Sequence, residues 1–367
     1  MFSHRVMLAF VVIHVVVAFS WAQTGTVKVT PLGSRTGDFC FLDRALLFED
    51  PTGVRILYDP GNTVQGGTDG RLGEVHAILI SHAHGDHLGS LKLNQDPNSP
   101  AALCAPGPGF GTAATPHSNA AQIAVAKNSA VIAGPPLTAF LGFRISQLRG
   151  APTPACPAGS PANELTVPRT EPCAGLLNPG GKRTIRHTSA NRGIQISPVT
   201  AVHPNELAPD FLTDPEKTDL ASNAISAYGG LANGFVVTFT NGLKVYLSGD
   251  TGLSSDMETV VHQFYKANLA VINISDLFVT GPEEAAHAVR NLIKAKAVIP
   301  SHVNEIATTG GVVNAGTRTA QFIELLRHGG ADDNKDDNDG NGTAVHVPRS
   351  GITMEFDGQA RCRAGCN

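Results

Sequence analysis

The segment at residues 81–87, Ser-His-Ala-His-Gly-Asp-His, constrains the fold of this chain more than any other part of its sequence. It directly follows residues 75–80, an apolar run rich in β-branched residues, which predicts a buried strand with this polar segment as the loop at its end. The loop gathers four side chains of the types that bind zinc and similar divalent ions: His82, His84, Asp86 and His87. Asp86 and His87 point differently from His82 and His84, so one loop can serve two neighbouring metals. The alternative is a solvated loop that binds nothing.

Three further potential ligands follow predicted strands that are far away in the sequence: His203, Asp250 and His302. Residues 194–202 are expected to form an edge strand because Pro198 interrupts them, and residues 297–299 form a short strand before His302. Residues 234–240 and 243–247 predict a hairpin, because the Asn-Gly pair between them suits a type I′ turn. Since ligands from separate strands meet where the strands end, we expect all seven residues to converge at one edge of a sheet.

Other elements are expected as strands at residues 26–32, 45–48, 54–58 and 269–274 and as helices at residues 88–93, 119–131, 318–328 and from Pro282 onward. Asp59 lies at the end of one of these strands. It either forms a hydrogen bond that orients a metal ligand, or is simply the residue that a turn before Pro60 favours.

The composition excludes some classes of function. The chain has 367 residues, is 42% hydrophobic and carries a formal net charge of −4, with no basic run. A surface that binds a nucleic acid backbone needs clustered Lys and Arg, so we expect no nucleic acid partner and a small-molecule substrate instead.

The N-terminus predicts export. Residues 1–22 contain a short charged start, an apolar run and small residues at Ser20 and Ala22, the pattern of a signal peptide cleaved after Ala22. An uncleaved membrane anchor or a buried helix is the alternative. We therefore expect a periplasmic or secreted protein, with no membrane contact after cleavage.

All six cysteines follow that cleavage point, and an even number in an exported chain predicts disulfides. Cys156 with Cys173 and Cys362 with Cys366 are the nearest neighbours in sequence, but the pairing stays open. We expect one domain at residues 23–367, with an insertion rich in Pro and Gly at about 97–193. The acidic segment at residues 332–342 imitates half of a calcium loop, but Pro348 stands where a bidentate Glu is needed.

The ligand set consists of His-x-His-x-Asp-His after a strand, a later His, an Asp in Ser-Gly-Asp-Thr and a final His. This set resembles that of the metallo-β-lactamase superfamily. The stretches at residues 229–235, 248–253, 281–286 and 298–302 resemble its branch of bacterial metal-dependent hydrolases related to L-ascorbate-6-phosphate lactonase. The resemblance covers roughly residues 26–96 and 194–305. It departs at residues 32–35, Leu-Gly-Ser-Arg, where a histidine usual in the branch is missing.

The resemblance implies an α/β fold, the αββα sandwich with two mixed sheets flanked by helices, and two divalent ions, zinc or manganese, at the sheet edge. Carried over by position, the first ion is held by His82, His84 and His203, the second by Asp86, His87 and His302, and both by Asp250. Asp276 matches a carboxylate of the branch that would support this site.

These observations predict a metal-dependent hydrolase. Water that bridges two metals has a pKa lowered toward neutrality and supplies hydroxide without a Ser or Cys nucleophile. We expect that hydroxide to attack a small ester, lactone or phosphoester, with Asp86 orienting it and passing its proton to the leaving group. A β-lactam or an N-acyl-homoserine lactone is an alternative substrate of the same fold. A non-hydrolytic metal-binding protein is an alternative of a different class.

Overall fold

The computed structural model describes residues 25–93, 96–98, 102–107, 109–157, 163–328 and 342–366. The predicted signal peptide and all of the acidic segment except Gly342 lie outside the described residues. Among the described helices, none is both long and apolar enough to cross a membrane.

The first sheet has eight strands within the described ranges. Their spatial order is β20 (Cys362–Ala364), β19 (Met354–Phe356), β1 (Val27–Pro31), β2 (Leu46–Glu49), β3 (Arg55–Tyr58), β4 (Ala77–Leu79), β7 (Ala130–Ala133) and β9 (Cys173–Leu176). Strands β3, β4, β7 and β9 run parallel to one another, whereas the pairs from β3 to β20 are antiparallel. The sheet is therefore mixed.

The second sheet also has eight strands in the part of the chain that is described. Their order is β18 (Ala344–Val345), β15 (Ala297–Ser301), β14 (Leu269–Asn273), β13 (Lys244–Leu247), β12 (Asn233–Thr238), β11 (Ile194–Thr200), β10 (Arg183–His187) and β8 (Glu164–Val167). Strands β13, β14 and β15 are parallel, and β12 is antiparallel to both β13 and β11. Hence β11, β13, β14 and β15 all end at the same edge of the sheet.

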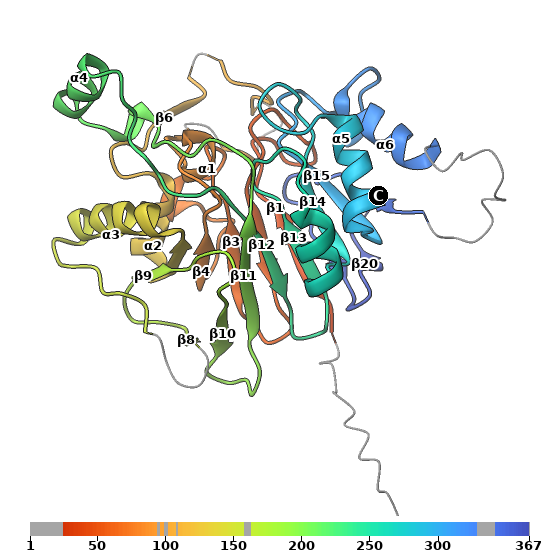
Figure 1. Ribbon diagram of the computed structural model, residues 1–367, viewed down its shortest axis with the longest axis horizontal. Coiled ribbons are helices and arrows are strands. Elements are labelled where there is room, and N and C mark those ends of the chain that lie inside the picture. The colour runs from red at the N-terminus through yellow and green to blue at the C-terminus, as the bar shows by residue number, and fades with distance from the viewer. Residues whose placement is uncertain are drawn as a thin grey trace, which may run out of the picture.

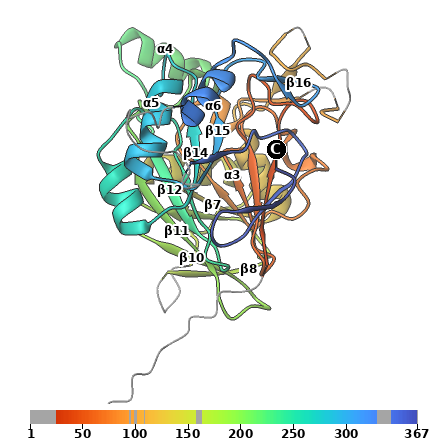
Figure 2. The ribbon, with the colours of Figure 1, turned by 90° about the vertical axis from the view of Figure 1, so that its right-hand side faces the viewer.

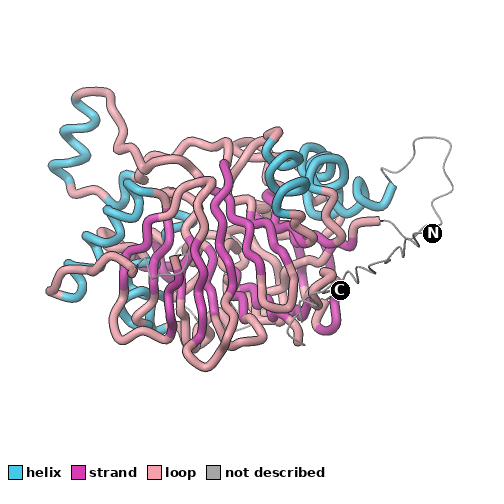
Figure 3. Tube along the Cα trace, turned by 60° about the horizontal axis from the view of Figure 1, so that its bottom comes forward, coloured by secondary structure: helices cyan, strands magenta, loops and turns pink. Residues whose placement is uncertain are grey.

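The two sheets pack face to face and helices cover both outer faces (Figures 1, 2 and 3). Alternation along each strand explains these layers: Ile56 and Val237 belong to the apolar core between the sheets, whereas Leu57 and Val236 face outward. The outer face of the first sheet is covered by α2 (Asn119–Lys127) and α3 (Pro135–Arg149). The other outer face is covered by η3 (Met257–Tyr265), α5 (Pro282–His287), η4 (Ala288–Ile293) and α6 (Arg318–His328). The predicted αββα sandwich is confirmed.

Shorter elements complete the edge at which these strands end. They are η1 (Gly66–Thr68), α1 (Gly85–Leu88), the strand pairs β5 (Leu91–Leu93) with β6 (Gly111–Ala113) and β16 (Thr308–Thr309) with β17 (Val312–Val313), η2 (Pro209–Phe211) and α4 (Asp214–Ser222). No residue of α4 is buried, and this helix projects from the body of the molecule (Figure 1). The helix predicted at residues 88–93 is wrong, since α1 ends at Leu88 and a strand follows.

The segment predicted as an insertion is largely part of the sandwich. Residues 97–193 supply β7 and β9 to the first sheet and β8 and β10 to the second. The helix expected at residues 119–131 ends at Lys127, because Asn128 adopts a left-handed conformation with φ 52° and the apolar residues after it form β7. Helix α3 was not predicted, although Pro135 begins it and Gly150, with φ 66°, ends it.

Strand β11 is an interior strand, contrary to the predicted edge position. Pro198 is tolerated there because β10 pairs only with residues 194–196 of β11, so Pro198 has a ladder partner, Phe235, on one side only. The predicted edge character therefore holds locally, for the half of β11 that approaches the site.

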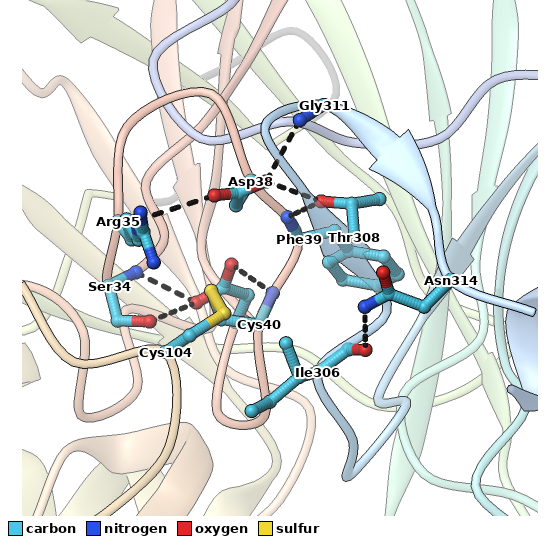
Figure 4. Close-up of a disulfide and its surroundings, with 11 residues drawn as sticks. Ser34, Arg35, Asp38, Phe39, Cys40, Cys104, Ile306, Thr308, Gly311 and Asn314 are labelled. Carbon is cyan, nitrogen blue, oxygen red and sulfur yellow. Dashed lines mark hydrogen bonds and ion pairs between the residues drawn. A yellow bond between two sulfur atoms is a disulfide. The ribbon is translucent and has the colours of Figure 1, made fainter. Parts of the chain in front are cut away.

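Three disulfides join all six cysteines: Cys156–Cys173, Cys362–Cys366 and Cys40–Cys104. The third fastens the long loop before β2 to the segment after β5, and Figure 4 shows its surroundings. In the same loop Asp38 accepts hydrogen bonds from Thr308 Oγ1 and Gly311 N, both at 2.9 Å, which ties the loop to the chain after β15.

Candidate metal centre

The ends of four strands deliver the seven predicted ligand residues to one place. The loop after β4 carries four of them, and β11, β13 and β15 are followed by one each, His203, Asp250 and His302. The last three strands run in the same direction, so their ends meet at one edge. Links between the sheets hold the first loop there, since Asn233 N donates to Ser81 O at 3.0 Å and Gly249 N donates to Tyr58 Oη at 2.9 Å.

One group of potential ligands consists of His82, His84, His203 and Asp250. Each residue contributes one nitrogen or oxygen atom, and these four atoms lie within 4.8 Å of one another. The rings of His82 and His84 are 4.5 Å apart between centroids, and both lie 5.0 Å from the ring of His203. This spacing suits a single ion among the four side chains.

A second group consists of Asp86, His87 and His302, with ligand atoms again within 4.8 Å of one another. Asp86 Oδ2 lies 3.4 Å from His302 Nε2 and 3.7 Å from His87 Nε2. Asp86 and His87 belong to the short helix α1, and although the ring of His87 lies 4.2 Å from that of His82 between centroids, its Nε2 faces Asp86 and Asp250. The loop is thus divided between two groups.

Asp250 lies between the groups. Its Oδ2 is 3.0 Å from His302 Nε2 and 3.7 Å from His203 Nε2, and its Oδ1 is 3.2 Å from His87 Nε2. The side chain is 4% exposed, so it faces histidines of both groups from a buried position. A carboxylate in this position can share its two oxygens between two ions.

The site fits metal ions because it contains buried polar atoms that nothing else satisfies. Among the described residues, His82 Nε2, His87 Nε2 and Asp250 Oδ1 are buried and make no hydrogen bond. Leaving such atoms unpaired is costly in a protein interior, and cations bound at the two groups would satisfy all three.

The carboxylates dominate the charge at this site: Asp250, Asp86 and Asp59 outweigh burial and raise the pKa of His87 well above its usual range, so a metal ion that binds His87 would displace its proton. Burial and the neighbouring His87 lower the pKa of His82 well below its usual range, which favours the neutral ring that binds a metal. Burial acts to raise the pKa of Asp250, but His302 and His87 outweigh it and hold that pKa well below its usual range. Asp250 therefore stays ionised.

Asp59 fixes the orientation of two histidines. Its Oδ2 accepts a hydrogen bond from His87 Nδ1 at 2.8 Å and another from Ser81 Oγ at 2.6 Å, while its Oδ1 accepts from Ser81 N at 2.9 Å. Because the Ser81 proton is directed to Asp59, the Ser81 oxygen accepts from His82 Nδ1, 3.0 Å away. Both rings thus direct an Nδ1 proton away from the site and point Nε2 toward it.

Asp276 lies outside this network. It is more than half exposed and pairs with Arg318 through atoms 3.2 Å apart. The residue before it makes the supporting contact, since Ser275 Oγ lies 3.1 Å from His302 Nδ1. Ser275, rather than Asp276, therefore supports the ligand His302.

Three supporting residues were not predicted from the sequence. Arg44 is buried, and its Nε donates to Asp86 Oδ2 at 3.3 Å. Asn205 Oδ1 accepts from Ala83 N at 2.7 Å, and Tyr58 Oη accepts from the chain next to Asp250. Asn205 follows His203 and Tyr58 ends β3, so nearness to a strand end was the available clue, but neither contact could be read from the sequence.

The comparisons with known proteins agree with this architecture. A profile of the metallo-beta-lactamase superfamily matches residues 45–106. A UPF0173 metal-dependent hydrolase of Cupriavidus metallidurans is 30% identical over 286 residues, which is 74% of this chain and 77% of the relative. Another from Thermodesulfovibrio yellowstonii is 28% identical over 270 residues, 72% of this chain and 77% of the relative.

Among solved structures, the metallo hydrolase Igni18 from Ignicoccus hospitalis superposes with a TM-score of 0.51 at 16% identity, over 90% of this chain and 99% of that one. This likeness shows a shared fold. Because more than two thirds of the Cupriavidus relative aligns at 30% identity, the chain belongs to the UPF0173 metal-dependent hydrolases, an enzyme family of the metallo-β-lactamase superfamily.

Proposed function

We propose that this hydrolase binds two divalent ions, zinc or manganese, at the seven converging residues and cleaves a small ester, lactone or phosphoester there. The position of Asp250 between two separate groups of ligands carries the proposal. One ion would be held by His82, His84 and His203, the other by Asp86, His87 and His302, and Asp250 would contact both.

When bound, such a pair of ions supplies a water of lowered pKa as nucleophile and polarises the oxygen of the bond to be cleaved. The chain offers no competing thiol nucleophile, because all six cysteines are in disulfides.

Asp86 is suited to move a proton. Burial acts to raise the pKa of its carboxyl group, but His87, His302 and Arg44 hold that pKa well below its usual range. The carboxyl group therefore stays ionised and can orient the water, and its side chain is 28% exposed, so a bound molecule could reach it, whereas His87 and Asp250 are 4% exposed. Asp86 would accept a proton from the attacking water and return it to the leaving group.

We also propose that the protein is exported to the periplasm or secreted. Three disulfides persist in an oxidising compartment and are rare in the cytosol, which supports the signal peptide expected from the sequence. Western blots of periplasmic, cytosolic and culture fractions test this, and retention in the cytosol would contradict it.

Metal analysis of Asp250→Asn tests the metal centre. We expect wild-type protein reconstituted with zinc or manganese to hold two ions per chain and to cleave at least one of a panel of ester, lactone, β-lactam and phosphodiester probes. Asp250→Asn is expected to lose metal and turnover. Asp276→Asn is the matched control, because Asp276 lies at the same edge and pairs with Arg318, and it is expected to keep both ions.

A folded Asp250→Asn protein that kept two ions and full activity would overturn the assignment. Far-ultraviolet circular dichroism of each variant establishes that the chain is folded before metal is measured.

A further inference from the structure

Large apolar side chains gather where the metal ligands emerge from the sheet. Those of Val202, Leu231, Leu253, Leu277 and Phe278 are 53%, 59%, 41%, 83% and 68% exposed. Each belongs to a segment next to a residue of the metal centre or at the same edge: Val202 precedes His203, and Leu253 follows Asp250 in the same loop. We call these five residues the apolar rim.

Hydrogen bonds from backbone N–H groups hold three of these segments side by side. Val202 N donates to Thr251 Oγ1 and Gly252 N donates to Val202 O, both at 3.0 Å. Thr280 N donates to Thr251 O, also at 3.0 Å, which brings the loop with Leu277 and Phe278 beside the same strand end. The segment that follows Asp250 thus lies between the segment with Val202 and the segment with Leu277 and Phe278, and both of these carry exposed apolar side chains.

Leu231 adds the remaining side of the rim. Ala201 N donates to Ala232 O at 3.2 Å, so the chain at Leu231 lies next to the chain at Val202. Strand β12 begins directly afterward and pairs Asn233 with Thr200, which places Leu231 at the edge where β11 ends.

The side chains of the rim segments offer an anionic substrate no cation beyond the ions proposed for the centre. The four described rim segments, residues 201–206, 229–232, 251–255 and 275–281, contain no Lys or Arg. Arg318 is committed to Asp276 at 3.2 Å and to Glu305 at 3.6 Å, and Arg44 is buried against Asp86. The ions proposed at the centre could bind a phosphate oxygen, but these segments would add no cationic side chain to hold the rest of the group, and the adjacent helix α5 has two acidic residues in its first turn.

We propose that the substrate is an uncharged carboxylic ester or lactone whose apolar acyl group lies on the apolar rim while its carbonyl group enters the metal centre. This inference rests on the proposed hydrolytic function and adds the class of substrate to it. Exposed apolar side chains on neighbouring segments beside a site favour a binding surface for an apolar group, since such side chains gain free energy only when something covers them.

The dependence of hydrolysis on acyl length tests the rim. We would measure kcat/KM of the metal-loaded full chain on p-nitrophenyl acetate, butyrate, hexanoate and octanoate below their aggregation concentrations. Burial of each additional methylene predicts a rise of about two- to fourfold in kcat/KM until the rim is covered. The double variant Leu277→Ser/Phe278→Ser is expected to lose about tenfold on the octanoate relative to its change on the acetate.

Phe264→Ser is the matched control. Phe264 is 73% exposed but lies near the end of η3, where the chain returns to the start of β14 and hence to the opposite edge of the sheet. It is expected to leave both the rate on each ester and the dependence on acyl length unchanged.

The outcomes separate the two proposals. Metal-dependent hydrolysis with no dependence on acyl length, or with a dependence that the double variant leaves intact, overturns the rim while sparing the hydrolytic function. Preference for a phosphoester of the same alkyl group overturns it too. If the double variant changes only the oligomeric state in gel filtration, the patch is a protein interface and the proposal is wrong. Absence of metal-dependent hydrolysis of every ester, lactone and phosphoester probe refutes the proposed function itself.

Discussion

Asp59→Asn is expected to weaken metal binding at both groups of ligands, although residue 59 itself belongs to neither group. The new asparagine would keep an oxygen for Ser81 N, but an amide NH2 would replace Oδ2, which now accepts from His87 Nδ1 and Ser81 Oγ. That NH2 would donate to His87 Nδ1, which forces the His87 proton onto Nε2. Ser81 would turn its proton toward His82 Nδ1, 3.0 Å away, with the same effect on His82.

The expected magnitude follows from this geometry. One histidine in each group would carry its proton on the atom that faces the metal, and loss of such a supporting contact lowers metal affinity by about 10- to 100-fold, or about 1.4–2.7 kcal/mol. The backbone adds no penalty, because Asp59 has φ 38°, a left-handed conformation that Asn adopts as readily as Asp. The effect should therefore come from the hydrogen bonds alone.

Asp50→Asn provides a control of the same chemistry. Asp50 is 1% exposed and accepts hydrogen bonds from the hydroxyl and backbone N–H groups of Thr52 and Thr240. It lies in the turn after β2, away from the metal edge. Both variants should lose stability, but only Asp59→Asn should lose metal affinity.

Competition with a chromophoric chelator for zinc measures the affinity, and thermal unfolding of the metal-free proteins measures stability. Equal metal affinity in wild type and folded Asp59→Asn would refute the role assigned to Asp59. An equal loss in Asp50→Asn would show that the effect reflects general destabilisation rather than the orientation of the histidines.

Three further changes test the surrounding structure. Replacing both Cys40 and Cys104 with Ala opens a loop of sequence separation 64, and the chain-entropy relation predicts a loss of about 4 kcal/mol in the free energy of unfolding. A denaturant titration that shows a loss of less than about 1 kcal/mol in this free energy would contradict the prediction. Tyr58→Phe removes the acceptor of the buried Gly249 N–H and is expected to cost about 1–3 kcal/mol in the same titration, and an unchanged midpoint would count against that contact. Burial acts to raise the pKa of Asp357, but backbone N–H groups and two guanidinium groups lower it to about 2 from 3.8. The ionised Asp357 therefore stabilises the fold above pH 3.8, and this contribution is lost as the pH falls toward 2. Melting temperatures between pH 4 and 2 should fall more steeply in wild type than in Asp357→Asn, and parallel curves would exclude the effect.

The positions of the seven candidate ligands could be predicted because each one depends on local sequence. A polar residue directly after an apolar run lies at a strand end, and strands that run in the same direction bring such residues to one edge. His203, Asp250 and His302 are each expected at that edge from a few preceding residues, and the structure places all three there. Whether they bind metal is the part that remains a prediction.

The supporting contacts could not be predicted, because they join residues whose separation in sequence carries no pattern. Arg44 reaches Asp86 and Asn205 reaches Ala83 only after the two sheets have packed together. Helix α3 escaped prediction for a different reason: it lies in a stretch rich in Pro and Gly, which disfavours long helices, whereas proline in the first turn is compatible with a helix.

The structure separates the parts of each loop that would hold metal from those that would select substrate. Asp250 is 4% exposed and faces the centre, whereas Val202 is 53% exposed and is fixed to its neighbours by its backbone N and O atoms alone. Exchanging the Val202 side chain therefore leaves its hydrogen bonds in place. Substitutions in the apolar rim should then shift kcat/KM between substrates at constant metal affinity, while Asp59→Asn should lower metal affinity without changing the order of preference. Two variants that each changed both properties would show that chemistry and selectivity are not divided in this way.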